Sequence, residues 1–153
     1  MMAEVTRSRT PSSGKGENDQ NEKEFLAVLK RKNDSSQEDQ ANLKLKTRPL
    51  RNGNGLQIFL TREDDPAFFY TLDITEDDFR ELKNSQELTT NFQTFPEMIF
   101  QLLDTCSENS QFSTVLIISD IEVEFKIQET GKYKVIPHLT LRLRKGNDAK
   151  VRT

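Results

Sequence analysis

The chain has 153 residues, 33% of them hydrophobic, and its 22 basic and 25 acidic side chains leave a formal net charge of −3. This length suffices for one domain with a core, and a charge so close to balance gives no strong field for nucleic acid. One cysteine excludes an internal disulfide, and with one histidine it cannot fill a zinc site. We therefore expect Cys106 and His138 to be ordinary packing or surface residues, and we expect no cofactor, metal or nucleic acid to bind.

The hydropathy of the chain bears on its expected location. No run of about 18 apolar residues exists and the N-terminus lacks an apolar signal segment, which predicts a soluble, cytoplasmic protein without a membrane partner. Residues 1–23 are polar and rich in Ser, Gly and charge. Such a segment buries too little to offset the entropy of ordering, so we expect a disordered tail.

Two strands are predicted next. Phe25–Lys30 is an apolar run of strand length, and residues 31–42 are predicted to be a polar connector. Residues 43–48 then alternate strictly. This period of two predicts a half-solvated strand with Leu43, Leu45 and Thr47 on one face.

A hairpin and a fourth strand follow. The Asn-Gly-Asn-Gly run at 52–55 is a strong turn signal, and residues 56–60 alternate again behind it. After an acidic turn, the aromatic, β-prone segment 67–74 predicts the fourth strand.

The first helix is predicted to begin at about Glu76. Thr75 is a good N-cap, and Asp78 stands at the third helical position, where its carboxylate can accept from a free backbone N–H. Ile74 and Phe79 have the spacing of a hydrophobic staple.

Two acidic clusters, residues 63–65 and 76–78, resemble a metal or two-carboxylate site only superficially. A calcium loop needs alternating acids, a central glycine and a terminal glutamate, which are lacking here. Turn and cap chemistry explains both clusters, and a hydrolase using Asp64, Asp65 or Asp77 is the least favoured alternative.

A second helix begins near Pro96. Ile99, Leu102, Leu103 and Cys106 recur at the spacing of one buried face. We expect this face to pack on the chain's own sheet, with a groove for another helix as the alternative.

Three strands complete the pattern. Residues 112–120 are apolar enough for a strand buried on both faces. Residues 121–128 alternate between an apolar face and a polar or charged face, and the apolar face consists of Ile121, Val123, Phe125 and Ile127. Residues 138–144 alternate as the last strand. The predicted fold class is a β-rich α+β domain: a small antiparallel β-barrel or sandwich of about seven strands, with a two-helix insertion between strands four and five. The sequence shows no Gly-rich phosphate loop, no nucleophile spaced from a histidine base and no metal-ligand cluster, so no catalytic site is predicted.

The turn between the last two strands contains an unusual residue. In the segment IQETGKYKVIPHL (Ile127–Leu139), Gly131 and two lysines form the predicted hairpin tip, but Tyr133 stands where turns are normally polar. An aromatic ring at a tip needs a place to bury or a partner. The alternative is that Tyr133 folds back on its own hairpin.

Two blocks of the sequence, residues 60–106 and 125–148, contain several specific motifs. They are the Asp-Pro-x-Phe-Phe turn, the Ile-Thr-Glu-Asp-Asp-Phe helix start, Phe95-Pro96, and Glu129-Thr130 followed by His138-Leu139-Thr140-Leu141. With these motifs the two blocks resemble the spindle assembly abnormal protein six family, the scaffold of the centriolar cartwheel.

This resemblance implies a fold and a function. The family's head domain is β-barrel-like, is similar to the heads of end-joining repair scaffolds, and is followed by a coiled coil. We therefore expect a tail at 1–23, a head domain at 24–148 and a polar C-terminal end at 149–153. No coiled-coil heptads appear before Thr153, so the resemblance also admits a shorter, coil-less relative from a flagellar or apical structure.

The family's heads pair with one another through the tip of the last hairpin. By resemblance Tyr133 is the inserted group, in place of the common phenylalanine, with Gly131, Lys132 and Lys134 beside it, and Phe79 and Leu82 are predicted for the partner pocket. The implied product is a ninefold ring in the centriole or basal body of a ciliated or flagellated cell. The partner is the chain itself, with other centriolar proteins possible, and a DNA end-joining repair scaffold head remains the alternative.

Overall fold

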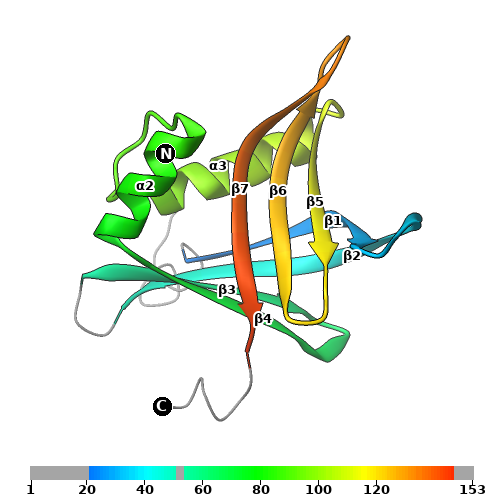
Figure 1. The fold of residues 1–153 in the computed structure, drawn as a ribbon, viewed down its shortest axis with the longest axis horizontal. Coiled ribbons are helices and arrows are strands. Elements are labelled where there is room, and N and C mark those ends of the chain that lie inside the picture. The colour runs from blue at the N-terminus through cyan, green and yellow to red at the C-terminus, as the bar shows by residue number, and fades with distance from the viewer. Residues whose placement is uncertain (1–20, 51–53, 147–153) are drawn as a thin grey trace, which may run out of the picture.

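The described residues of the chain form seven strands and two helices. The computed structural model describes residues 21–50 and 54–146, drawn in colour in Figure 1. The elements in chain order are β1 (Glu22–Arg31), β2 (Asp34–Pro49), β3 (Gly55–Arg62), β4 (Asp65–Thr75), α2 (Glu76–Gln86), α3 (Phe95–Glu108), β5 (Phe112–Ile118), β6 (Glu122–Thr130) and β7 (Val135–Lys145). Both helices lie between β4 and β5, so the predicted two-helix insertion is confirmed.

The strands close into a barrel in the order β1, β2, β3, β4, β7, β6, β5. Every neighbouring pair is antiparallel except β1 and β5, which pair in parallel from Val28 to Arg31. The β4–β7 contact is short, since only Tyr70 and Thr71 of β4 pair with β7. The predicted antiparallel fold is therefore correct apart from this one parallel pair, and the barrel splays between β4 and β7.

The prediction of a polar connector at residues 31–42 is wrong. A two-residue turn joins β1 to β2, and β2 pairs with β1 from Asp34 onward. Exposed polar side chains such as Glu38 and Asp39 show no apolar alternation that would indicate a strand. The backbone of these residues nevertheless pairs with β1. β1 also begins at Glu22, within the predicted tail, while residues 1–20, 51–53 and 147–153 lie outside the described residues.

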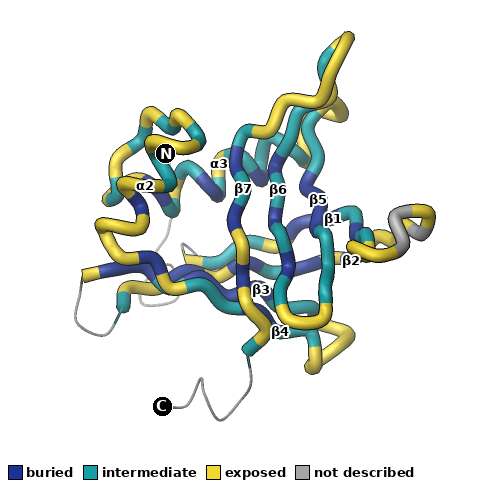
Figure 2. The backbone as a smooth tube through the Cα atoms, in the orientation of Figure 1, coloured by how far each residue is buried: buried dark blue, intermediate teal, exposed yellow. Residues whose placement is uncertain are grey.

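The core fills the barrel with the inward faces of the strands. Leu43, Leu45 and Thr47 are all buried, as the alternation of β2 predicts. Phe125 is fully buried and meets Phe25 edge to face at 6.0 Å between ring centroids. Figure 2 shows this buried interior as dark segments of the strands.

The prediction for Ile121 is wrong. It lies in the turn between β5 and β6 rather than in a strand, and it is 71% exposed. Val123, which follows it in the same alternation, is the first inward residue of β6 and is fully buried. The backbone N–H of Ser119 closes this turn by donating to the carbonyl of Glu122.

A complete capping box starts α2, as the sequence predicts. The Thr75 hydroxyl accepts from the Asp78 N–H at 3.1 Å, and the Asp78 carboxylate accepts from the Thr75 N–H at 3.0 Å. Ile74 and Phe79 are both buried beside it. The three acids of the first turn also favour the positive end of the helix dipole.

Replacement of Thr75 by Ala is expected to lower the free energy of unfolding by about 1 kcal/mol, because the Asp78 N–H at the start of α2 loses its side-chain acceptor. Thr75→Ser keeps the hydroxyl and is the matched control. Urea titration monitored by circular dichroism measures both variants. Equal loss in the two variants would contradict a role for the hydroxyl.

Helix α3 packs on the barrel's own strands, chiefly β5, β1 and β6. Ile99 and Leu103 are buried, Phe95 joins them, and Leu102 and Cys106 lie half-buried at the flank. The predicted packing on the sheet is thus confirmed. Burial raises the pKa of the Cys106 thiol, which contacts the Thr114 hydroxyl at 3.5 Å.

Candidate functional site

The β6–β7 hairpin projects beyond the rest of the domain (Figures 1 and 2). Its tip residue Tyr133 is 88% exposed, so the alternative in which the ring folds back on its own hairpin is wrong. Val135 and Ile136 beside it are also exposed, at 50% and 38%. Three of the five large exposed apolar residues in the described part of the chain therefore lie within four positions, at and beside the hairpin tip.

Several contacts hold the projecting hairpin in one shape. The Gly131 N–H donates to the Lys134 carbonyl at 2.8 Å, and a Cβ at Gly131 would lie only 3.1 Å from that oxygen. Below the turn, Glu129 and His138 meet across the strands at 2.9 Å, and the His138 ring stacks on Phe112. A rigid hairpin loses little further freedom when a partner binds its tip.

A pocket of about 550 Å³ lies where β4 and β7 splay apart. Residues 72–74 of β4, residues 140–142 of β7 and Glu124 of β6 form its walls, and α2 contributes Asp78, Leu82 and Gln86. Of the two predicted pocket residues, Leu82 lines this pocket. Phe79 does not line it, because its ring is 4% exposed and packs against Phe92 and Phe95 in the core.

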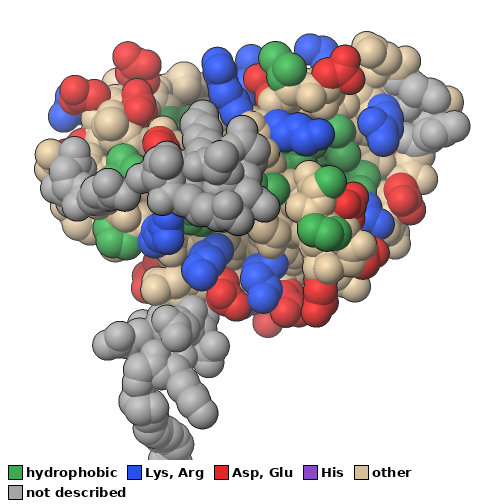
Figure 3. All heavy atoms as spheres, turned by 90° about the horizontal axis from the view of Figure 1, so that it is seen from below, with side chains coloured by type: hydrophobic (Ala, Val, Ile, Leu, Met, Phe, Trp, Pro, Cys, Tyr) green, Lys and Arg blue, Asp and Glu red, His purple; other side chains and the backbone are tan. Residues whose placement is uncertain are grey.

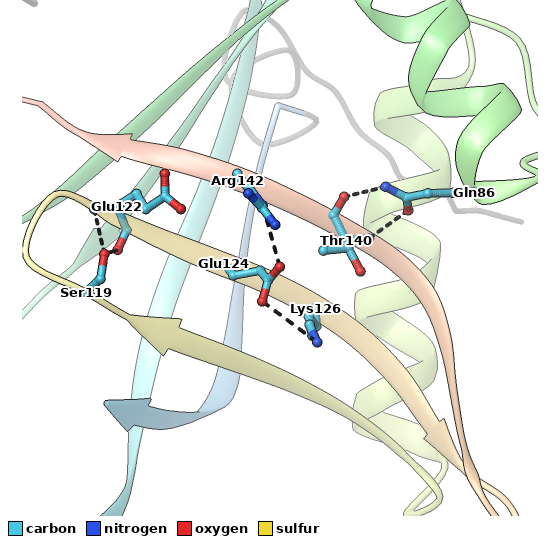
Figure 4. Close-up of polar contacts among 7 residues, drawn as sticks. All are labelled: Gln86, Ser119, Glu122, Glu124, Lys126, Thr140 and Arg142. Atoms are coloured by element: carbon cyan, nitrogen blue, oxygen red, sulfur yellow. Dashed lines mark hydrogen bonds and ion pairs between the residues drawn. The ribbon is translucent and has the colours of Figure 1, made fainter. Parts of the chain in front are cut away.

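Helix α2 is tied to the free edge of β7 beside the pocket. The Gln86 amide donates to the Thr140 carbonyl at 2.7 Å and accepts from the Thr140 N–H at 2.9 Å, as a neighbouring strand would (Figure 4). Glu124 lies between Arg142 and Lys126, at 3.6 and 3.8 Å. No local sequence signal identifies the Gln86 contact, because the two residues are 54 positions apart.

The tip and the pocket of one head lie far apart. Tyr133 and Leu141 are eight positions apart along the chain, which is roughly 25 Å at about 3.3 Å per residue in extended backbone. The strands of the hairpin pair with each other from Thr130 and Val135, just below the turn, down to Glu122 and Arg144. Tyr133 therefore cannot enter the pocket of its own head, and only a second molecule can bring the two together.

The acidic clusters at 63–65 and 76–78 have local partners. Arg62 donates to Asp64 at 2.7 Å, and this hydrogen bond lowers the pKa of Asp64. Asp77 pairs with Arg80, and Asp78 belongs to the capping box. Among residues 21–50 and 54–146, no group of three or more His, Cys, Asp or Glu could hold a metal ion.

One further face of the molecule shows no concentration of one charge. On the face in Figure 3, basic and acidic side chains are interspersed. None of the helices in the described part of the chain has the length and apolar character needed to span a bilayer. The described residues thus form a closed barrel with a projecting hairpin that carries an exposed aromatic side chain at its tip.

The particular family follows from comparison with known proteins. The model of the centriolar protein SAS N-terminal domain matches residues 19–143. The chain therefore belongs to the SAS-6 N-terminal domain family, and the predicted membership is confirmed.

Two relatives and two solved structures illustrate the match. The spindle assembly abnormal protein 6 homologues of Gallus gallus and Mus musculus are 33% and 35% identical over 107 residues, or 63% of this chain. The chain spans only 17% and 16% of their lengths. The N-terminal domain of Leishmania SAS-6 aligns with a TM-score of 0.71 at 21% identity, covering 82% of this chain and 96% of that one. An N-terminal coiled-coil dimer of C. elegans SAS-6 aligns with a TM-score of 0.70 at 18% identity, covering 86% and 81%.

Proposed function

We propose that this chain is the head domain of a structural, non-catalytic protein of the centriolar or basal-body cartwheel, in which heads pair and build a ninefold ring. The observation that carries the proposal is the isolated, 88% exposed Tyr133 on a rigid hairpin. The family resemblance implies an inserted aromatic or large apolar group at this position. Gly131, Lys132 and Lys134 complete the inserted tip.

The pocket beside α2 is the receptor that suits this tip best. Leu82, Leu72 and Ile74 supply apolar wall, and Gln86 and Thr140 supply polar groups within reach of a phenol. Burial of the Tyr133 hydroxyl in the pocket without a hydrogen bond would cost roughly 1–3 kcal/mol. The polar groups of the pocket can supply that hydrogen bond, so they suit a tyrosine at the tip.

A head contact of this kind assembles a ring only together with a second interface. Two different two-fold contacts on one subunit must propagate, and they close into a ring or continue as a helix. The C. elegans SAS-6 structure is described as a coiled-coil dimer, which supports such a second contact for the whole protein. A weak head contact then suffices, because pairing presents two heads together and closure makes late contacts intramolecular.

Sedimentation of the purified chain over a wide concentration range tests the proposal. The weight-average mass is expected to rise from monomer towards dimer with concentration. A chain that stays monomeric at its highest soluble concentration would contradict head pairing.

The location in the cell is tested separately by fluorescent tagging of the intact protein. The proposal expects a signal at the centrioles or basal bodies. A signal at another flagellar or apical structure would instead favour the coil-less relative.

A further inference from the structure

We propose that the head contact is steered by charge: Lys132 and Lys134 of one head bind an acidic rim, Asp73 and Asp78, around the pocket of a second copy. This inference rests on the proposed function and adds the residues that set affinity, salt dependence and partner choice. The group that binds in the pocket is the hairpin tip of a second copy of this chain.

The tip carries two uncompensated positive charges. Lys132 and Lys134 flank Tyr133 and are exposed, and within the described residues neither forms an ion pair. The Lys132 ammonium lies 5.4 Å from the centroid of the Tyr133 ring. The Tyr133 ring therefore enters a pocket together with the positive charges of Lys132 and Lys134.

The pocket rim carries the opposite charge. Asp73 at the end of β4 and Asp78 at the start of α2 both line the pocket and are exposed. Each accepts only a neutral hydrogen bond, from the Gln57 amide and the Thr75 N–H respectively. In the described part of the chain, neither carboxylate has a cationic partner.

The third acid of the pocket is already neutralised. Glu124 pairs with Arg142, which also lines the pocket, so these two side chains together add no net charge to its lining. Two free positive charges at the tip therefore match two free negative charges at the rim. Exposed pairs are individually weak, but charges arranged in this way raise the rate of encounter and disfavour wrong partners.

A two-fold contact uses this match twice. When each tip enters the other head's pocket, the axis passes midway between positions 133 and 141, close to Pro137. Pro137 has no N–H to donate, which disfavours strand-to-strand pairing across the axis. The exposed Val135 and Ile136 then lie where two hairpins cross and bury apolar area against each other.

Charge reversal on one side and then on the other tests the inference. A tip variant carries Lys132→Glu and Lys134→Glu. A pocket variant carries Asp73→Lys and Asp78→Asn, because an asparagine oxygen can still accept from the Thr75 N–H. Lys32→Glu with Lys46→Glu is the matched control, since it changes the net charge of the chain as much as the tip variant does, at exposed lysines without an ion pair in the described residues.

Each variant alone is expected to pair with itself at least about tenfold more weakly than wild type, because both of its tip-to-rim contacts bring like charges together. An equimolar mixture is expected to recover pairing as heterodimers, since both contacts are then attractive. Wild-type pairing should also weaken as NaCl rises from about 50 to about 500 mM, when screening shortens to a few Å. Sedimentation with one variant fluorescently labelled measures all three effects, and thermal melting checks the fold.

The outcomes separate this inference from the proposed function. Wild-type pairing that Tyr133→Glu abolishes but that neither charge variant changes would overturn only the charge steering. A mixture that fails to recover, or a control that weakens as much as the tip variant, would overturn it as well. A wild-type head that remains monomeric would overturn both.

Discussion

Replacement of Tyr133 by Glu is expected to abolish self-association of the head while leaving its fold intact. The ring is 88% exposed in the single head and makes no core contact, so the variant should melt at the wild-type temperature. In the paired state the introduced glutamate carboxylate would lie against the apolar lining of the pocket, close to Asp73 and Asp78. That environment disfavours the ionised group both by desolvation and by repulsion.

The expected size of the effect is large because the contact is made twice. Burial of an aromatic side chain contributes about 1.5–3 kcal/mol. Two copies per dimer correspond to a loss of roughly two to four decades in the dissociation constant.

Tyr133→Phe is the matched control for the ring, since it removes only the hydroxyl. It should retain pairing within about thirtyfold, because the dimer contains two such hydroxyls and each hydrogen bond contributes about 1 kcal/mol. Sedimentation at matched concentrations compares the three proteins. Undiminished dimerisation of Tyr133→Glu would contradict the role of the tip.

Replacement of Phe79 by Ala is expected to destabilise the whole head by about 3–5 kcal/mol, the usual cost of removing a buried aromatic ring. Its ring joins α2 to the loop before α3 through Phe92, at 5.5 Å, and to α3 through Phe95, at 4.9 Å between centroids. The prediction of Phe79 as a pocket residue thus becomes a prediction about the support beneath the pocket.

Leu82→Ala separates the two roles. Leu82 is only half-buried and lines the pocket, so its truncation should weaken pairing while costing much less stability than the loss of Phe79. Chemical denaturation and sedimentation of both variants give the comparison. A Phe79→Ala head as stable as wild type would contradict its place in the core.

Local patterns predicted the elements whose cause is local. The capping box at Thr75 and Asp78, the alternation of Leu43, Leu45 and Thr47, and the apolar run of β5 each depend on residues within a few positions. Their energetic preferences are carried by the side chains themselves, so the sequence displays them. The hairpin tip belongs to this group, because an aromatic residue in a turn conflicts with turn chemistry.

Features that depend on backbone pairing or on distant contacts were not visible in the sequence. The first part of β2 is held by its ladder to β1, so its polar side chains resemble a connector. The parallel closure of β1 on β5 joins segments far apart in the chain. The pocket has the same character, since Gln86 meets Thr140 only after the barrel has formed.

The acidic rim shows how a correct local explanation can be incomplete. Asp78 was accounted for by its cap, and that role is confirmed by its hydrogen bond to the Thr75 N–H. The same carboxylate also lines the pocket, next to Asp73. Only the three-dimensional arrangement relates these two acids to the two lysines of the hairpin tip.

The most direct test of head pairing uses a fluorophore at the tip. The chain contains no tryptophan, so Tyr133→Trp introduces a single reporter at the proposed point of insertion. If the tip enters a pocket of a second head, tryptophan emission shifts to the blue and becomes protected from acrylamide as concentration rises, in step with the dimer fraction from sedimentation. Emission that remains solvent-exposed at concentrations where dimers prevail would contradict insertion of the tip.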